Sequence, residues 1–319
     1  MTKLKKAAFA AAAALILQGA APPAAPSAEA QANAEDIVVT ARRSGIPVWH
    51  VRSDTTSVIL VGVIEGVTKD TKWDPASLEA AIRKSDRVMF PNMVAVSVSP
   101  FKMIGYLMKW RGQSKMDKGR SLQQMLAPAD FARLTALQGK GALDKGFERK
   151  HPLHLSMTLR GRARRGLGDG VDPNSFVRKV ARKHKVEVVP IASLKGKPLA
   201  QDLFNSPAQR HIPCLLASID VAEAGPEAVR AYSHAWAQRR VAEVLRSPVE
   251  RPGLTCWPAD LPLEAASRPH LKAGVRKLLA DPRVTLAVFS LRALAEPNGI
   301  LDDLDAAGFD IQGPAWKGQ

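Results

Sequence analysis

The sequence predicts an α/β fold, on the border with α+β, in which helices flank a central mixed sheet. One indication is the run SVILVGV at residues 57–63, which is too apolar for a surface and is typical of a buried strand. Another is the order strand, helix, strand over residues 57–90, which indicates a βαβ-like unit. A third is the segment 100–185, where helical patterns predominate and basic residues outnumber acidic ones. We expect this segment to be a helix-rich basic insert.

The elements of the N-terminal half follow from short local patterns. After EDIVVTARRSG at residues 35–45, the two runs of PVWHVRSDTTSVILVGV predict strands separated by the turn-forming SDTTS. Asp74 is a suitable N-cap for the next helix, and Pro75 suits its first turn. The sequence RVMF at residues 87–90 predicts the following strand. The apolar stripe of the helix consists of Leu78, Ala81 and Ile82.

The C-terminal half continues the alternation of helices and strands. Residues 126–139 carry a helix start signal and a closing glycine, and DPNSFVRKVARKHK predicts a helix before the strand VEVVPI. The remaining predicted elements are two helices in 207–247 around DVAEAG, a helix in 262–280, the strand RVTLAVFSL, the helix PNGILDDLDAAG and the short strand FDI.

Residues 1–34 have the order of a secretory signal peptide. Three lysines precede the apolar stretch AAFAAAAALILQG, and a stretch of small residues follows with cleavage candidates at Ala30 and Ala34. We therefore expect an exported, periplasmic protein. Residues 35–46 are then a flexible N-terminal segment, and residues 47–319 a single domain.

The chain has two cysteines, Cys214 and Cys256. In an exported protein they form the one available pair, which predicts a disulfide bond. The alternative is two unrelated buried thiols.

The positive charge is concentrated in one part of the chain. The formal net charge is +16, and removal of residues 1–34 leaves +14. Residues 102–185 contain 20 Lys or Arg and 6 Asp or Glu, which is again +14. Such a segment can attract an anionic envelope polymer or lipid headgroups, and export argues against nucleic acid. The alternative is a solvated basic face without a partner.

Two parts of this basic segment are specific candidates. Arg162, Arg164 and Arg165 lie together in GRARRGLGDG, which predicts a loop and makes them anion-binding candidates. The stretch from Lys102 to Arg111 is amphipathic, and either packs in the core or lies on a membrane surface.

Motifs of known chemistry are scarce. His151 and His154 in HPLH have a metal-like spacing, but a proline lies between them and no carboxylate or cysteine is near. The chain has no Gly-x-Ser-x-Gly, no His-Glu-x-x-His and no phosphate-binding loop. The residues alone therefore indicate no active site.

Several stretches resemble one known family. PVWHVRSDTTSVILVGVIEGV, ASLEAAIRKSDRVMF, GVD, VEVVPI and the end VTLAVFSLRALAEPNGILDDLDAAGFDIQGP are similar, in order and spacing, to the TraB/GumN family, which includes the Tiki proteins. The resemblance implies a metal-dependent hydrolase, and in Tiki a protease. It also implies two Gly-x-x-His motifs after buried strands and glutamates at other strand ends, which together suit a divalent metal.

This chain departs from the family pattern at both histidine positions and at both glutamate positions. The first motif runs from Gly62 to Glu65, so a glutamate replaces the histidine. The two glutamate positions hold Pro91 and Ala192, and the second motif holds Ser290 for its glycine and Ala293 for its histidine. Proline and alanine side chains neither ligate a metal nor transfer a proton.

The resemblance with these substitutions implies a non-catalytic binding or scaffolding protein without a cofactor. The alternative is a metal-dependent hydrolase with a relocated or residual active site. A second resemblance concerns the N-terminal segment: residues 35–43, EDIVVTARR, are similar to the TonB box of outer-membrane transporters. It implies strand addition of Asp36–Arg43 to a TonB-like partner. The alternative is an edge strand of the domain itself.

Overall fold

The computed structural model describes residues 28–53, 56–95, 115–116, 119–195, 206–251, 256 and 267–317. Most of the predicted signal peptide and the whole amphipathic stretch Lys102–Arg111 lie outside these residues. The first described element is helix α1 (Ala28–Arg43), so both predicted cleavage positions, Ala30 and Ala34, fall inside a helix.

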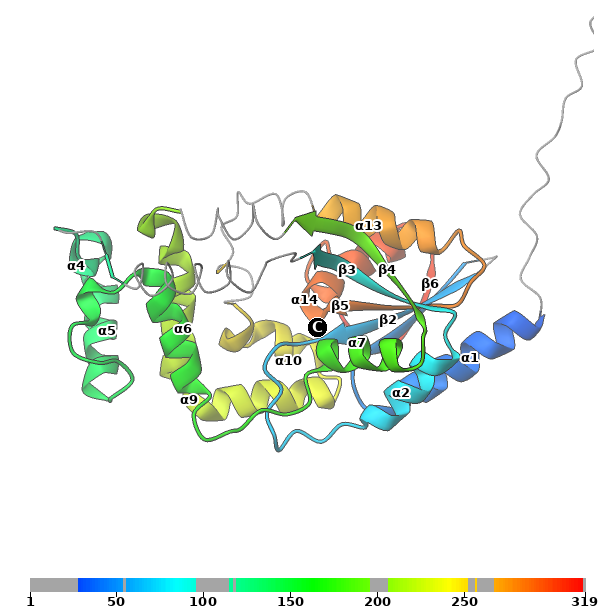
Figure 1. Ribbon diagram of the computed structural model, residues 1–319, viewed down its shortest axis with the longest axis horizontal. Coiled ribbons are helices and arrows are strands. Elements are labelled where there is room, and N and C mark those ends of the chain that lie inside the picture. Colours follow the sequence, from blue (N-terminus) through cyan, green and yellow to red (C-terminus); the bar gives the residue numbers. More distant parts are fainter. Residues whose placement is uncertain are drawn as a thin grey trace, which may run out of the picture.

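A mixed six-stranded sheet forms the centre of the molecule (Figure 1). Its strands are β1 (Val48–Arg52), β2 (Ser57–Val63), β3 (Arg87–Ala95), β4 (Glu187–Lys195), β5 (Thr285–Ser290) and β6 (Asp310–Gln312), in the spatial order β4-β3-β5-β2-β1-β6. Strand β1 is antiparallel to both of its neighbours, and the other strands all run in one direction. The predicted α/β class is confirmed.

The predicted strand–helix–strand unit is present, but its two strands are not neighbours. Helix α2 (Pro75–Lys84) connects β2 to β3, and Asp74 caps it by accepting hydrogen bonds from two backbone N–H groups. Strand β5, more than 190 residues later than β3, lies between β2 and β3 and pairs in parallel with each of them. The C-terminal part of the chain therefore completes the centre of the sheet.

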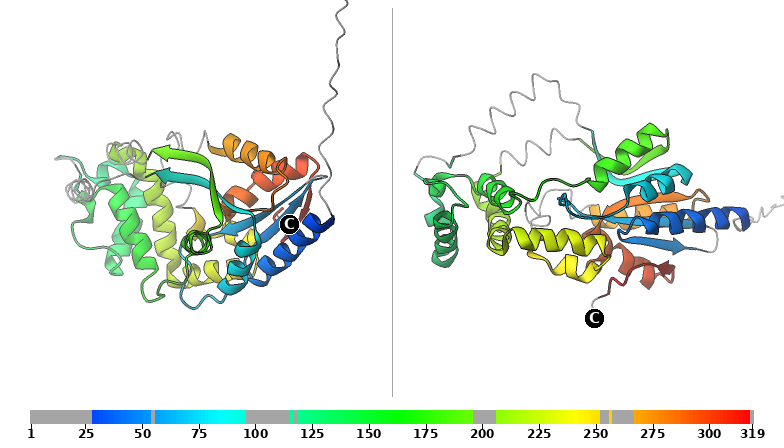
Figure 2. Two further views of the ribbon diagram at one scale, coloured as in Figure 1. Left: turned by 45° about the vertical axis from the view of Figure 1, so that its right-hand side comes forward. Right: turned by 90° about the horizontal axis from the view of Figure 1, so that it is seen from below.

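Helices cover both faces of the sheet. Helices α1, α2 and α7 (Pro173–Lys183) lie on one side, and α13 (Ser267–Leu278) lies on the other, packed against β4 and α15 (Ile300–Ala306) (Figures 1 and 2). The short helix α14 (Leu291–Ala295) connects β5 to α15.

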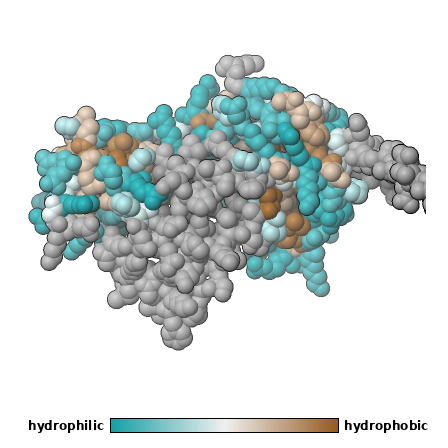
Figure 3. Space-filling model, turned by 90° about the horizontal axis from the view of Figure 1, so that it is seen from above, coloured by the Kyte–Doolittle hydropathy of each residue, from teal (hydrophilic) through white to brown (hydrophobic). Residues whose placement is uncertain are grey.

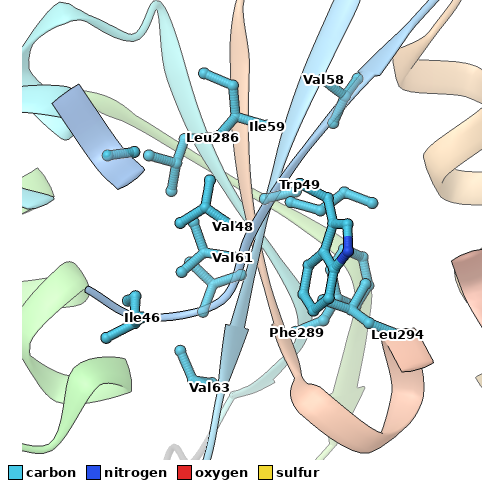
Figure 4. Close-up of a cluster of buried hydrophobic side chains, with 14 of the residues drawn as sticks. Ile46, Val48, Trp49, Val58, Ile59, Val61, Val63, Leu286, Phe289 and Leu294 are labelled. Carbon is cyan, nitrogen blue, oxygen red and sulfur yellow. The ribbon is translucent and has the colours of Figure 1, made fainter. Parts of the chain in front are cut away.

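Alternating side chains of β1, β2 and β5 fill the core on both faces. Val48, Val61 and Leu286 project to one side of the strands, whereas Trp49 and Phe289 project to the other (Figure 4). All of these side chains are buried. The continuous apolar run of β2 is thus explained by cover on both faces.

A second hydrophobic core lies in a helical region beside the sheet (Figure 1). It is formed by α4 (Leu122–Met125), α5 (Pro128–Gly139), the 3-10 turn η1 (Phe147–Arg149), α6 (Pro152–Ala163) and the first part of α9 (Ile212–Ala237). The described part of the basic segment is therefore mostly helical, as predicted. It is not one insert, however, because α7 packs against α2 on the sheet rather than in this second core.

Helix α9 joins the two cores and is broken in the middle. Gly225 has φ +74°, a left-handed conformation that glycine adopts without strain, and Pro226 follows it. Leu215 and Ile219 before the break belong to the helical core, whereas Tyr232 and Trp236 after it belong to the sheet core. The sequence DVAEAG was expected to separate two helices, and it does so. Two further elements follow: α10 (Val241–Arg246) and the 3-10 turn η3 (Pro248–Glu250).

The expected disulfide partners lie together. Cys214 on α9 and Cys256 have their sulfur atoms 2.09 Å apart, and Cys214 is fully buried. The bond closes a loop of 42 residues, which in the chain-entropy description stabilises the fold by about 4 kcal/mol.

The interpretation of residues 35–46 as a flexible, strand-like segment is wrong. Residues 35–43 form most of α1, and Ile37, Val38 and Ala41 are buried in the sheet core. In a strand, Ile37 and Val38 would point to opposite faces, whereas in a helix these three residues share one face. Burial of that face outweighs the strand preference of β-branched residues. Asp36–Arg43 is thus not in the extended conformation that strand addition to a TonB-like partner requires.

None of the helices in the described part of the chain combines the length and the hydropathy needed to cross a membrane.

Candidate functional site

The family-motif positions gather at one edge of the sheet. Gly62 pairs with Phe289, and Val63 with Ser290, so the two Gly-x-x-His positions lie side by side where β2 and β5 end. Pro91 and Ala192 occupy the next two strands, β3 and β4, which pair through Asn92 and Ala192. Four neighbouring strands therefore bring these positions together. Gly62 and Ser290 lie at the carboxyl ends of β2 and β5, where ligands of α/β sheets commonly bind, whereas Pro91 and Ala192 lie inside β3 and β4.

Pro91 and Ala192 were expected just after their strands, but both lie within them. Strands β3 and β4 continue to Ala95 and Lys195. Strand β3 pairs with β5 only as far as Met89, so beyond that point its second edge is not engaged by β5. Pro91 lacks a backbone N–H and is tolerated at such a place.

Gly62 is required by close packing. A Cβ atom at this position would lie 2.7 Å from Leu291 Cδ1 and 2.9 Å from Trp49 Cζ3. The carbonyl oxygen of Gly62 accepts a 2.9 Å hydrogen bond from Trp236 Nε1 on α9. This part of the family motif thus keeps a packing role.

Glu65, at the histidine position of the first motif, points away from the core. Its side chain is 85% exposed, and its carboxylate lies 3.8 Å from Arg160 Nη2 on α6. The following residue, Gly66, has φ +77°, and its carbonyl oxygen accepts a hydrogen bond from Arg164 Nη1. The residues that follow β2 are therefore held by arginines at the C-terminal end of α6.

The second motif has become a helix cap. Ser290 Oγ accepts a 3.2 Å hydrogen bond from the backbone N–H of Ala293 and starts α14. A serine at an N-cap needs no further function. The motif positions thus present one exposed carboxylate, Glu65, and no imidazole.

A partly buried ionisable cluster lies close to these positions. Arg292 Nε donates to Glu250 Oε1 at 3.2 Å, and Tyr232 Oη donates to Glu250 Oε2. The side chains of Arg292 and Glu250 are only 15% and 12% exposed. Burial raises the pKa of the Glu250 carboxyl, against the opposing effects of Tyr232 and Arg292, and the charge of Glu65 adds to the increase. Burial and Glu250 also raise the pKa of Tyr232.

The polar groups of this cluster are paired with one another and with neighbouring groups. Arg292 also lies 3.8 Å from Glu296 and donates to the carbonyl oxygen of Leu245 at 3.2 Å. A carboxyl group held in this way by a guanidinium and a phenol is suited to joining η3, α9 and α14. Tyr232 and Glu250 carry no recognisable signal in the sequence, whereas Arg292 lies inside the degenerate SLRA motif.

The metal that the family implies does not fit the residues present. The motif positions supply one carboxylate, Glu65, together with proline, alanine and serine side chains. Among the described residues, no group of three or more His, Cys, Asp or Glu is arranged to hold a metal ion. In HPLH, His151 caps α6 by accepting from the Leu153 N–H at 3.3 Å, and its ring contacts that of His211.

The three arginine candidates have different surroundings. Arg162 lies in the last turn of α6 rather than in a loop, 3.5 Å from Asp144. Arg164 is held by Gly66 and by Asp169 at 3.1 Å, so its role is structural. Arg165 is exposed in the turn that follows α6. The described surface of the face in Figure 3 is largely hydrophilic, with smaller hydrophobic patches.

Comparison with known proteins gives a family match that spans the whole sheet. Residues 47–313 match the TraB/PrgY/gumN family, from the start of β1 to just beyond β6. No curated protein and no solved structure gives a significant match. The match covers most of the chain and contains all the strands described above. The chain therefore belongs to the TraB/PrgY/gumN family.

Proposed function

We propose that this protein is an exported, non-catalytic member of its family that binds an anionic polymer of the cell envelope. The observation that carries the first part is the chemistry of the sheet edge. The family-motif positions provide one exposed carboxylate, Glu65, and the nearby carboxyl of Glu250 is engaged by Arg292 and Tyr232.

The basic surface supports the second part. Several basic side chains of the helical region pair with acids of neighbouring elements, as Arg133 does with Asp220 and Glu223. Other basic side chains of the segment 102–185 are exposed, including Arg165 and, on α7, Lys179 and Arg182. The large exposed hydrophobic side chains in the described residues come from separate elements: Val39 from α1, Met157 from α6 and Val171 from the segment before α7. Such a surface is better suited to binding a charged polymer than to inserting into a bilayer, because insertion needs an apolar face.

Metal binding tests the non-catalytic part. Protein purified without an affinity tag is incubated with zinc or manganese, and bound metal is measured after gel filtration. We expect no stoichiometric metal in either the wild type or Glu65→Ala. Tight binding by the wild type that Glu65→Ala abolishes would contradict the proposal and support the hydrolase with a relocated site.

Retention on an anionic matrix tests the binding part. The polymer proposal predicts strong retention on immobilised acidic polysaccharide at low salt, and a steep loss as salt rises, because screening shortens the reach of the charges to about 8 Å at physiological salt. Sedimentation with anionic lipid vesicles without retention on polysaccharide would contradict the polymer proposal in favour of lipid headgroups.

A further inference from the structure

An arginine-lined groove lies at the same end of the sheet as the family-motif positions, beside the outer strand β6. It has a volume of about 700 Å³ and is formed by the end of α1, the start of β1, the residues between α9 and α10, helix α10 itself, and the segment after β6. Its lining contains four arginines, Arg42, Arg239, Arg240 and Arg246, and one acidic residue, Glu243. None of them belongs to the basic segment 102–185.

The positive charge of the groove is not balanced. Arg240 pairs with Glu243 at 2.6 Å, which leaves three guanidinium groups. Within the described part of the chain, neither Arg239 nor Arg246 has an acidic side chain at ion-pair distance. Arg42 donates to the carbonyl oxygen of Gln312 at 2.7 Å, a contact that positions it without neutralising it. Burial and the charge of Arg239 lower the pKa of Arg42, so the two cations destabilise each other in the absence of an anion.

The walls of the groove are fixed by packing. The segment after β6 folds over Trp49, whose Nε1 donates to the carbonyl oxygen of Pro314 at 2.9 Å. A Cβ atom on Gly313 would lie 2.3 Å from Trp49 Cδ1, so any larger residue would displace the Trp49 ring or the segment itself. Arg239, which also lines the groove, has φ +60°, which is unfavourable for an arginine and directs the chain from α9 into α10. Strand β6 runs in the same direction as β2, so the groove lies at a strand's carboxyl end.

We propose that this groove is a binding site for a phosphoryl group. An uncompensated charge of three guanidinium groups matches a multiply charged anion better than a single carboxylate. The planar guanidinium forms paired hydrogen bonds with phosphate oxygens. The open form of the groove admits either a soluble phosphate ester or the phosphate of a lipid headgroup. This site is independent of the polymer-binding function proposed above, since it shares no residue with the basic segment.

Titration with inorganic phosphate tests the site, with chloride replaced so that ionic strength stays constant and heat measured by calorimetry. A second arm uses sedimentation with vesicles of phosphatidylcholine containing phosphatidic acid, and with phosphatidylcholine alone. The variants are Arg239→Asn, because asparagine tolerates a positive φ, and Arg246→Gln. Arg43→Gln is the control, because Arg43 is an exposed neighbour of Arg42 outside the groove lining.

We expect saturable binding to phosphate, to phosphatidic acid vesicles, or to both. Each groove variant should weaken it by about tenfold or more, as expected for the loss of one charge-assisted hydrogen bond, and Arg43→Gln should leave it unchanged. Binding to phosphatidic acid vesicles without binding to free phosphate identifies a lipid headgroup as the ligand. Binding to free phosphate without binding to the vesicles identifies a soluble phosphate ester. Absence of both kinds of binding, or unchanged binding in both groove variants with normal melting temperatures, would overturn the proposal.

Discussion

The indole Nε1 of Trp236 donates a 2.9 Å hydrogen bond to the carbonyl oxygen of Gly62, in the buried interior. This contact joins the last turn of α9 to the end of β2, and therefore joins the family motif to the helix that leads to the arginine groove. The surroundings of the family-motif positions and of the arginine groove therefore both depend on how α9 packs against β2.

Gly62→Ala should destabilise the protein by about 1–3 kcal/mol, because the added methyl would lie within 3 Å of Leu291 and Trp49. Urea unfolding followed by tryptophan fluorescence measures this. Gly161→Ala is the matched control, since a Cβ there meets nothing within 4 Å and the residue lies in helix α6. The control should stabilise slightly or leave stability unchanged. Equal effects of the two substitutions would show that Gly62 is not packed as described.

Arg292→Met should destabilise by about 3 kcal/mol, because it leaves the carboxyl of Glu250 buried without its cation. Combining it with Glu250→Gln should restore part of the loss, which a double-mutant cycle in urea quantifies. Arg276→Met on α13 is the control: Arg276 is 52% exposed, and its partner Asp303 keeps Lys272 at 3.8 Å. It should cost less than about 1 kcal/mol. Additive losses in the double variant would mean that Glu250 and Arg292 do not act as a pair.

Arg164→Glu should reduce the stability of the fold, whereas Arg165→Glu should reduce binding to an anionic polymer. Arg164 holds Gly66 and Asp169, so its reversal should lower the melting temperature, whereas reversal of the exposed Arg165 should not. Arg165→Glu should instead elute earlier in a salt gradient from immobilised acidic polysaccharide. Lys277→Glu, an equal charge change on the exposed side of α13, serves as control. If Arg165→Glu and Lys277→Glu elute together, net charge alone explains the retention.

His50 should make stability fall as the medium becomes acidic. Its side chain is buried on β1, and burial, followed by the charges of Arg52 and Arg42, lowers its pKa from 6.5 to about 4, while Asp310 opposes the shift. Above pH 6.5 the ring is neutral in both states and contributes no pH dependence. Between pH 6.5 and 4 the unfolded chain takes up a proton that the folded protein does not accept, so folding free energy is lost.

The measurement is the unfolding free energy of the wild type and His50→Gln at a series of pH values. The difference between them should be flat above pH 6.5 and should change in favour of the variant by about 3 kcal/mol on reaching pH 4. Parallel curves over the whole range would rule out a depressed His50 pKa.

Much of the local structure could be predicted because it depends on neighbours in the chain. Asp74 caps α2, and Asp172 caps α7 by accepting from the Ser175 N–H, as short-range hydrogen bonding favours. The apolar run of β2 and the break at Gly225 likewise need only a few consecutive residues. The identity of the residues at the family-motif positions was also available from the sequence, and with it the absence of both motif histidines.

The tertiary structure decided what depends on distant partners. Residues 35–43 have a strand-like composition, but burial of Ile37, Val38 and Ala41 on one face makes them a helix. The insertion of β5 between β2 and β3 has no local signal, because parallel neighbours need not be consecutive. Glu250 and Arg292 are separated by 42 residues and meet only when η3 packs on α9 and α14 packs on α10. The groove arises in the same way, since its arginines come from α1, α10 and the residues between α9 and α10, which only the folded sheet edge brings together.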